Sequence, residues 1–240
     1  MHESLPEKQT VLVTGAGRRL GFYATTALLK KGYRVIANYR TTSQQLFAWL
    51  QDHPEYTSFL IPCQADLQNE FDCILDAVDS YATSLVGCIH SASQFYPASL
   101  FDEDSFESLY DIHCRISIRL GKLLYTKTAS PTFLIPMIDA QIEGLNQTYQ
   151  AYRVSKLFLK ELIRQLAYTG APRVRVNGLS PGTILPPLHE SRESFSGAQK
   201  KELIPRSATV EEFLNALFYL ITAESVTGQI LHVDGGSHCL

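Results

Sequence analysis

Residues 11–21 read VLVTGAGRRLG, and this stretch decides the fold class. Three apolar residues lead into Thr14 and Gly15, and an apolar segment over residues 22–31 ends at Gly32. The pattern predicts a strand, a glycine-rich turn and a helix, the opening unit of a dinucleotide-binding fold. Glycines let the backbone approach a pyrophosphate, and free N–H groups at a helix start favour anionic oxygens. An ordinary strand–turn–helix without a ligand is the alternative interpretation.

Two arginines, Arg18 and Arg19, stand inside this turn. Positive charges oppose the dipole at the start of a helix, so their placement suits a polyanionic ligand that offsets them. Two solvated surface charges are the alternative. We expect the pair to lie beside phosphate groups.

Composition is that of an ordinary globular chain. Of 240 residues, 45% are hydrophobic and 19% are charged, enough for one large α/β domain. The net charge of −3 argues against binding to nucleic acid or to an anionic membrane, and no apolar run is long enough to cross a bilayer. The polar start has no signal-peptide pattern, and five scattered cysteines without CxxC spacing fit a reducing compartment. A cytoplasmic protein is expected, with no nucleic-acid or membrane partner.

Histidines give no metal pattern. His232, Asp234 and His238 cluster near the end of the sequence, but their spacing does not match known zinc sites. No metal is expected.

Strands and helices alternate along the whole chain. This predicts a single-domain Rossmann fold over residues 1–240, a doubly wound, mostly seven-stranded parallel sheet flanked by helices. The long irregular stretch Thr183–Arg206 is expected to be a substrate lid. The expected strands are Thr10–Val13, Tyr33–Tyr39, Ser58–Gln64, Cys88–Ser91, Thr132–Ile138, Val174–Leu179 and Gln229–Val233. The expected helices follow the glycine turn and cover Gln44–Gln51, Asn69–Leu85, Ser105–Tyr125, Tyr149–Tyr168 and Ala208–Thr222.

The end of the second strand selects the cofactor in folds of this type. An acidic residue there binds the ribose 2′-hydroxyl of NADH, whereas a nearby arginine accommodates the 2′-phosphate of NADPH. Here the position is Tyr39, followed by Arg40 and Thr41, with no carboxylate to repel a phosphate. NADPH is therefore expected rather than NADH.

Tyr152 and Lys156 are four residues apart at the start of an expected helix, so they share one face. An ammonium beside a phenol lowers the pKa of the phenol, which then exchanges a proton near neutral pH. The arrangement resembles the short-chain dehydrogenase/reductase family over essentially the whole chain. The ordered marks of the resemblance are Thr14–Gly21, Asp66, Tyr152, Lys156, Asn177, Pro181, Gly182 and the run Asp234–Gly236.

The resemblance implies both cofactor residues and assembly. It implies that Lys156 holds the nicotinamide ribose, that Asp66 meets the adenine amino group, and that the protein is a homotetramer. The cofactor-binding residues it implies are Gly15, Gly17, Arg18, Arg19, Leu20, Tyr39, Arg40, Thr41, Asp66, Leu67, Ser91, Ala92, Ser93, Tyr152, Lys156, Pro181, Gly182 and Thr183.

Departures from the general family pattern concern the substrate. Carbonyl-reducing members have a serine thirteen residues before the tyrosine, where this chain has Asp139. A carboxylate repels a carbonyl oxygen that gains negative charge, but it favours a basic ring nitrogen. His113 takes the place of the asparagine that the family uses in catalysis, and Arg19 takes the place of the middle glycine of the turn.

These departures resemble the pteridine reductases and the similar bacterial dihydromonapterin reductases. The resemblance implies that Arg19 contacts cofactor phosphate and the pterin, that Ser93 and Phe95 hold the pterin ring, and that Asp139 works with Tyr152 to protonate a ring nitrogen. Reduction of a dihydropterin such as dihydrobiopterin, dihydromonapterin or dihydrofolate by NADPH is the first hypothesis. Reduction of a ketone or 3-oxoacyl thioester is the second, and an NADPH-binding protein without activity is the third.

Overall fold

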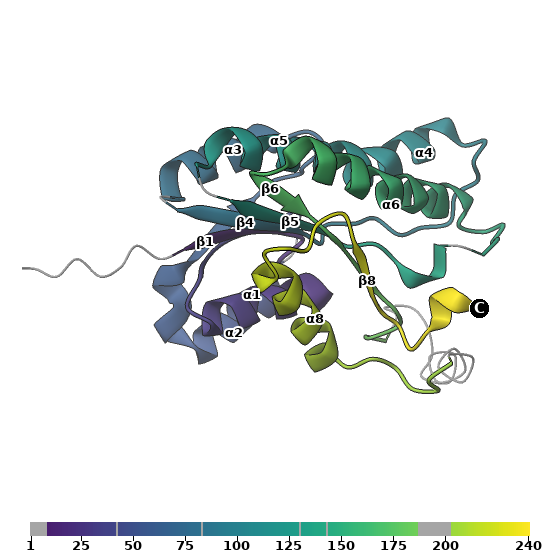
Figure 1. The fold of residues 1–240 in the computed structure, drawn as a ribbon. Helices are drawn as coiled ribbons and strands as arrows, with labels where there is room; N and C mark the ends of the chain where they lie inside the picture. Colours follow the sequence, from purple (N-terminus) through teal and green to yellow (C-terminus); the bar gives the residue numbers. More distant parts are fainter. Residues whose placement is uncertain (1–8, 42, 83, 130, 143, 187–202) are drawn as a thin grey trace, which may run out of the picture.

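Parallel β-strands form the centre of the molecule in the computed structural model, which describes residues 9–41, 43–82, 84–129, 131–142, 144–186 and 203–240 (Figure 1). Over these residues, six strands pair in the order β3-β2-β1-β4-β5-β6, and β7 pairs with β8 beside them. The order reverses between β1 and β4, which is where doubly wound sheets bind ligands. The strands are β1 (Thr10–Thr14), β2 (Arg34–Tyr39), β3 (Leu60–Gln64), β4 (Leu85–His90), β5 (Thr132–Pro136), β6 (Val174–Val176), β7 (Gly178–Pro181) and β8 (Ile230–Val233).

Helices cover both faces of the sheet. In Figure 1, α3, α4, α5 and α6 lie over one face, and α1, α2 and α8 lie over the other. Strand side chains alternate between the two cores: Leu12 and Ile36 pack toward the first, and Val11 and Val35 toward the second. The helices are α1 (Arg19–Lys30), α2 (Gln44–Asp52), α3 (Phe71–Tyr81), α4 (Glu103–Tyr110), α5 (Ile116–Lys127), α6 (Gln150–Gly170) and α8 (Val210–Thr222), with short helical turns η1 (Pro54–Phe59), η2 (Asp111–Arg115), η3 (Ala140–Ile142) and η4 (Ser237–Cys239).

The α/β Rossmann class expected from the sequence is confirmed, but the seven-strand count is wrong. The expected strand Val174–Leu179 is interrupted at Asn177 and becomes β6 and β7. The buried Asn177 side chain donates to the carbonyl of Val226 and accepts from the N–H of Gln229. These bonds tie the chain to the segment before β8, and β7 then pairs with β8.

One long helix was expected over Ser105–Tyr125, and the structure divides it. A π-helical turn, η2, separates α4 from α5. Its freed carbonyl at Ile112 accepts from Nε2 of His90 at 2.8 Å. Wide turns of this kind are frequent at functional sites, and this one carries His113.

Three further features bear on the sequence expectations. No helix among the described residues is long and apolar enough to span a membrane. All five cysteines are free thiols, with Cys63, Cys88 and Cys114 buried. Of the expected lid, residues 183–186 and 203–206 are described and residues 187–202 lie outside the described part.

Candidate active site

The glycine turn brings the chain close to the end of β4. Gly15 has a φ of +67°, and a Cβ there would lie 2.8 Å from the backbone nitrogen of Ala92. A Cβ at Gly21 would collide with the carbonyl oxygen of Gly15. Any larger residue at either position would therefore displace the turn, and the absence of side chains leaves the backbone open to a ligand.

Arg19 keeps the backbone conformation of the glycine that it replaces. Its φ is +52°, the left-handed region that favours glycine. Its guanidinium donates to the carbonyls of Pro186, at 2.9 Å, and Leu185. Burial and the charge of Arg18 lower the pKa of Arg19 below its ordinary value. The side chain thus links the glycine turn to the start of the expected lid.

Residues expected near the adenosine end surround the carboxyl ends of β2 and β3. Tyr39 is half-buried and packs edge-on against Phe47, whereas Arg40 and Thr41 are exposed. Asn38, which the sequence analysis did not single out, is buried and donates to the carbonyls of Cys63 and Ala65. It fixes β2 to β3 at the point where Arg40 leaves the sheet.

Asp66 begins a turn after β3. Its carboxylate accepts from the backbone N–H of Gln68 and from the side chain of Asn69. Leu67 beside it is buried in the core.

A buried hydrogen-bond chain holds the end of β4. The Thr14 hydroxyl accepts from the N–H of Ala92 and lies 2.7 Å from Nδ1 of His90. Nε2 of His90 donates to Ile112. Burial lowers the pKa of His90 to about 4, so the ring is neutral. The chain positions Ser91 and Ala92 beside the glycine turn.

Tyr152 and Asp139 are joined by a hydrogen bond in the candidate site. The Tyr152 hydroxyl donates to Oδ2 of Asp139 at 2.8 Å, and Oδ1 of Asp139 accepts from the N–H of Gln141. Burial, the Asp139 charge and this hydrogen bond raise the pKa of Tyr152 well above its ordinary value. Lys156 was expected to lower this pKa, and that expectation is wrong, because burial and the carboxylate both favour the neutral phenol.

Lys156 is buried below the tyrosine. Its Nζ donates to the carbonyl of Met137 at 2.8 Å and lies 5.9 Å from the Tyr152 ring centroid. Burial lowers the pKa of Lys156 to about 8, against an upward effect of Asp139. Tyr152 and Lys156 thus share a face of α6, as their spacing predicts.

An aromatic pair lies at the mouth of the site. Phe95 is 62% exposed and stacks on Tyr149, with ring centroids 4.5 Å apart and planes 7° apart. It also meets Tyr152 edge-on at 4.8 Å. Tyr149 was missed as a site residue, and its signal was an aromatic side chain three residues before Tyr152. One face of Phe95 is therefore covered, and the ring remains largely accessible.

His113 joins the site to the helix behind it. Its Nε2 lies 2.8 Å from the Ser93 hydroxyl, and its Nδ1 lies 2.9 Å from the hydroxyl of Ser155, a second residue that the sequence analysis missed. The ring meets Tyr152 edge-on at 5.5 Å. Ser93 is exposed, whereas His113 and Ser155 are fully buried.

The turn expected over Pro181–Thr183 packs against the residues that follow β8. A Cβ at Gly182 would lie 2.8 Å from Cα of Asp234, and the N–H of Gly182 donates to Val233. The Asp234 carboxylate accepts from the N–H groups of Gly236 and His238, from the Ser237 hydroxyl and from the His238 ring. His232, Asp234 and His238 place ligand atoms within 4.8 Å of one another, and the carboxylate of this cluster closes the turn.

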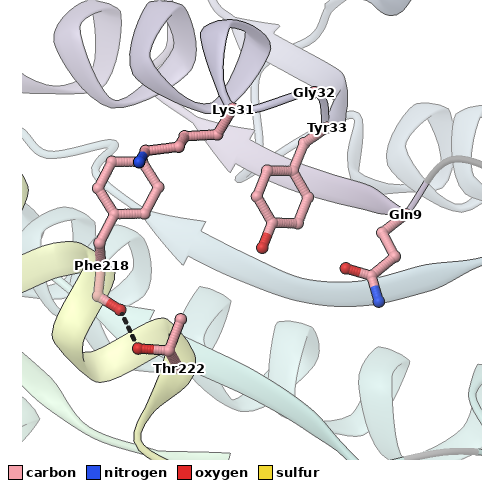
Figure 2. A pocket seen from close by; sticks show the side chains of 6 residues that line it. All are labelled: Gln9, Lys31, Gly32, Tyr33, Phe218 and Thr222. Carbon is pink, nitrogen blue, oxygen red and sulfur yellow. Dashed lines mark hydrogen bonds between the residues drawn. The ribbon is translucent and has the colours of Figure 1, made fainter.

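A separate hollow lies at the opposite end of the sheet. Figure 2 shows Lys31 reaching the Phe218 ring, with Tyr33 and Gln9 on the other side. Gln9 and Tyr33 precede β1 and β2, so this hollow opens at the amino ends of the strands. The residues expected to bind ligands follow the carboxyl ends, and none of them lines it.

The chain is similar to known reductases over nearly its whole length. A family model described as "Enoyl-(Acyl carrier protein) reductase" matches residues 15–238. The chain is 27% identical to the dihydromonapterin reductase of Citrobacter koseri over 238 residues, covering 95% of this chain and 96% of that protein. It is also 27% identical to an Escherichia coli dihydromonapterin reductase over 246 residues, covering 98% of each.

Solved structures give the same grouping. The FolM alternative dihydrofolate reductase 1 of Brucella suis, crystallised with NADP, superposes with a TM-score of 0.89 at 25% identity, covering 96% of this chain and 95% of that one. Its Brucella canis counterpart, also complexed with NADP, has a TM-score of 0.86 at 25% identity, covering 96% and 94%.

Proposed function

This chain belongs to the short-chain dehydrogenase/reductase family, and on that premise we propose that it is an NADPH-dependent reductase that converts a dihydropterin to its tetrahydro form. The reduction adds hydride to the carbon and a proton to the nitrogen of a ring C=N bond. The relatives named dihydromonapterin reductase and alternative dihydrofolate reductase support this substrate class.

The contact between Tyr152 and Asp139 is the observation that carries the proposal. A C=N reduction needs a proton donor at nitrogen, and Tyr152 is kept in its protonated form by burial and by the carboxylate. A serine at position 139 would instead donate to a carbonyl oxygen. The carboxylate accepts hydrogen bonds, so it favours a heterocycle with N–H groups over a ketone.

The cofactor cradle fits NADPH. The tight turn around Gly15 and Gly21 leaves room for a pyrophosphate, and no carboxylate follows Tyr39 where a 2′-phosphate would lie. When bound, NADPH supplies the hydride. Arg18 and Arg40 hold its phosphates in this proposal, and Lys156 holds the nicotinamide ribose.

In this proposal the substrate ring is bound by Ser93 and by the stacked pair of Phe95 and Tyr149. Phe95 offers a flat, exposed surface whose other face rests on Tyr149, and a planar heterocycle stacks well on such a surface. Tyr152 lies edge-on to Phe95, which directs its hydroxyl and Asp139 toward the edge of a stacked ring.

NADPH oxidation by the purified protein tests the proposal. Dihydrobiopterin, dihydromonapterin, dihydrofolate and an acetoacetyl thioester are supplied in parallel at several pH values. Turnover with a dihydropterin but not with the thioester is the expected result. Turnover with the thioester alone would replace the proposal with a carbonyl reductase.

A homotetramer in a reducing compartment completes the proposal. Helices α5 and α6 carry large exposed apolar side chains, which a partner subunit would cover. These side chains are Ile118, Tyr125, Leu157 and Phe158. The buried free thiols of Cys63, Cys88 and Cys114 agree with a cytoplasmic location.

A further inference from the structure

The hydrogen-bond partners of His113 determine where its hydrogen lies. The Ser155 hydroxyl has one hydrogen, which it donates to the carbonyl of Tyr152 at 2.7 Å. Toward Nδ1 of His113, at 2.9 Å, Ser155 therefore acts only as an acceptor. A neutral His113 ring with its hydrogen on Nδ1 is the arrangement in which both contacts of the Ser155 hydroxyl are hydrogen bonds.

The same ring is neutral at physiological pH. Burial, the charge of Lys156 and the nearby His90 lower the pKa of His113 well below its ordinary value. With its hydrogen on Nδ1, the ring has a lone pair on Nε2. The hydroxyl 2.8 Å from that nitrogen belongs to Ser93, and this hydroxyl must be the donor. Its other acceptor, the carbonyl of Gln94, is 3.5 Å away and much weaker.

We propose that His113 is a specificity-determining positioning residue, which fixes the Ser93 hydroxyl hydrogen inward so that Ser93 meets substrate only as a hydrogen-bond acceptor. This inference rests on the proposed function and deepens it. Ser93 is exposed and lies two residues before Phe95, so its hydroxyl oxygen remains accessible to a ligand. With its hydrogen held by His113, Ser93 then presents only acceptor lone pairs to a ring stacked on Phe95.

Such a site selects the amino-bearing edge of a pterin. An acceptor gains a hydrogen bond from an amino group, whereas it opposes a carbonyl oxygen and leaves both oxygens unsatisfied. A serine free to rotate would accept either group. The tautomer of His113 therefore makes the Ser93 hydroxyl disfavour rings that carry a 2-oxo group.

Binding of two heterocycles to the enzyme–NADP⁺ complex tests the inference. Pterin carries a 2-amino group and lumazine a 2-oxo group, and isothermal titration calorimetry gives the ratio of their dissociation constants. We expect Ser93→Ala and His113→Phe each to reduce the preference for pterin about tenfold, with no further loss in the double variant, because the two residues act through one hydroxyl.

Ser155→Ala provides a second route that keeps the histidine, so the test survives if His113→Phe does not fold. It removes the acceptor at Nδ1, releases the tautomer, and should lower the preference in the same direction. Ser117→Ala is the matched control, since Ser117 is equally buried but donates to the His113 carbonyl at 2.6 Å rather than to its ring. It should leave the preference within about twofold of the wild type.

The tautomer itself has a spectroscopic signature. In ¹⁵N-histidine-labelled protein, His113 should show a protonated Nδ1 and an unprotonated Nε2, and Ser155→Ala should change this pattern. An unchanged preference in both His113→Phe and Ser155→Ala, or additive effects of His113→Phe and Ser93→Ala, would overturn the inference while dihydropterin reduction stands. A wild-type enzyme that binds neither heterocycle and reduces no dihydropterin overturns the proposed function as well.

Discussion

The Tyr152 phenol donates to the Asp139 carboxylate at 2.8 Å; Asp139 lies between β5 and η3, and Tyr152 lies in the first turn of α6. Two separate segments thus meet in one acid–acceptor pair. Burial and the neighbouring negative charge both favour the protonated phenol, so the pair is suited to giving a proton rather than taking one.

Tyr152→Phe removes the proton donor without emptying the space beside Phe95. We expect kcat for dihydropterin reduction to fall about 10²- to 10⁴-fold, as for loss of a general acid. NADPH affinity, measured by fluorescence titration, should change little. A loss below tenfold would remove Tyr152 from the chemical step.

Asp139→Asn keeps the shape of the side chain and removes its charge. Because that charge raises the pKa of Tyr152, the pKa should fall and the basic limb of the pH–kcat profile should move to lower pH. Asp139→Ser should abolish pterin reduction with NADPH affinity nearly unchanged. Full activity of Asp139→Ser would contradict the role of the carboxylate in proton delivery.

Arg40→Asp should shift cofactor preference toward NADH. A carboxylate at this exposed position repels a 2′-phosphate, so NADPH affinity should fall about tenfold or more while NADH affinity is retained. The ratio of kcat/KM for the two cofactors measures the shift. Arg164→Asp, the same charge change on the exposed surface of α6, is the control, and an equal shift there would indicate a general charge effect.

Arg19→Gly and Arg19→Ala separate backbone strain from side-chain contacts. Both lose the bonds to Leu185 and Pro186, but only glycine relieves the φ of +52°. The glycine variant should be more stable than the alanine variant by about 1 kcal/mol in urea denaturation. Equal stabilities would show that the left-handed conformation is not retained.

Lys156 should make the stability of the cofactor-free protein depend on pH. Its pKa is about 8 when folded, against an ordinary value of 10.5, so between these values the unfolded chain binds more protons. Stability from this group therefore rises with pH across that window and is constant below it. The free energy of unfolding of the wild type minus that of Lys156→Met should increase from pH 8 to pH 10. A flat difference would mean that the ammonium is not desolvated.

Apolar periodicity and the glycine turn predicted the Rossmann class and most of the elements, because strands and helices with a buried face follow from local pattern. The interruption at Asn177 and the π-helical turn at His113 were missed. The Asn177 side chain donates to the backbone carbonyl of Val226, and the His90 side chain donates to the backbone carbonyl of Ile112 in the π-helical turn. Both features therefore involve contacts between residues far apart in the sequence. A single sequence holds no signal for such contacts.

The candidate site was likewise predicted only in part from the sequence. Tyr152 and Lys156 were paired by helical spacing, and family resemblance supplied Asp139 as their partner. The stacking of Phe95 on Tyr149 joins residues 54 positions apart and required the fold. The direction of the Tyr152 pKa shift also required it, since burial and the proximity of the carboxylate are properties of the packed molecule.

The stack of Phe95 on Tyr149 also bears on stereochemistry. Tyr149 covers one face of Phe95, so a planar substrate ring stacks on the other face of Phe95. The two faces of the substrate ring then have different surroundings. One face of that ring rests on Phe95, and only the opposite face is open to hydride. In the proposed reaction, a dihydropterin bound in one orientation is attacked from a single side, and its new stereocentre should have a single configuration.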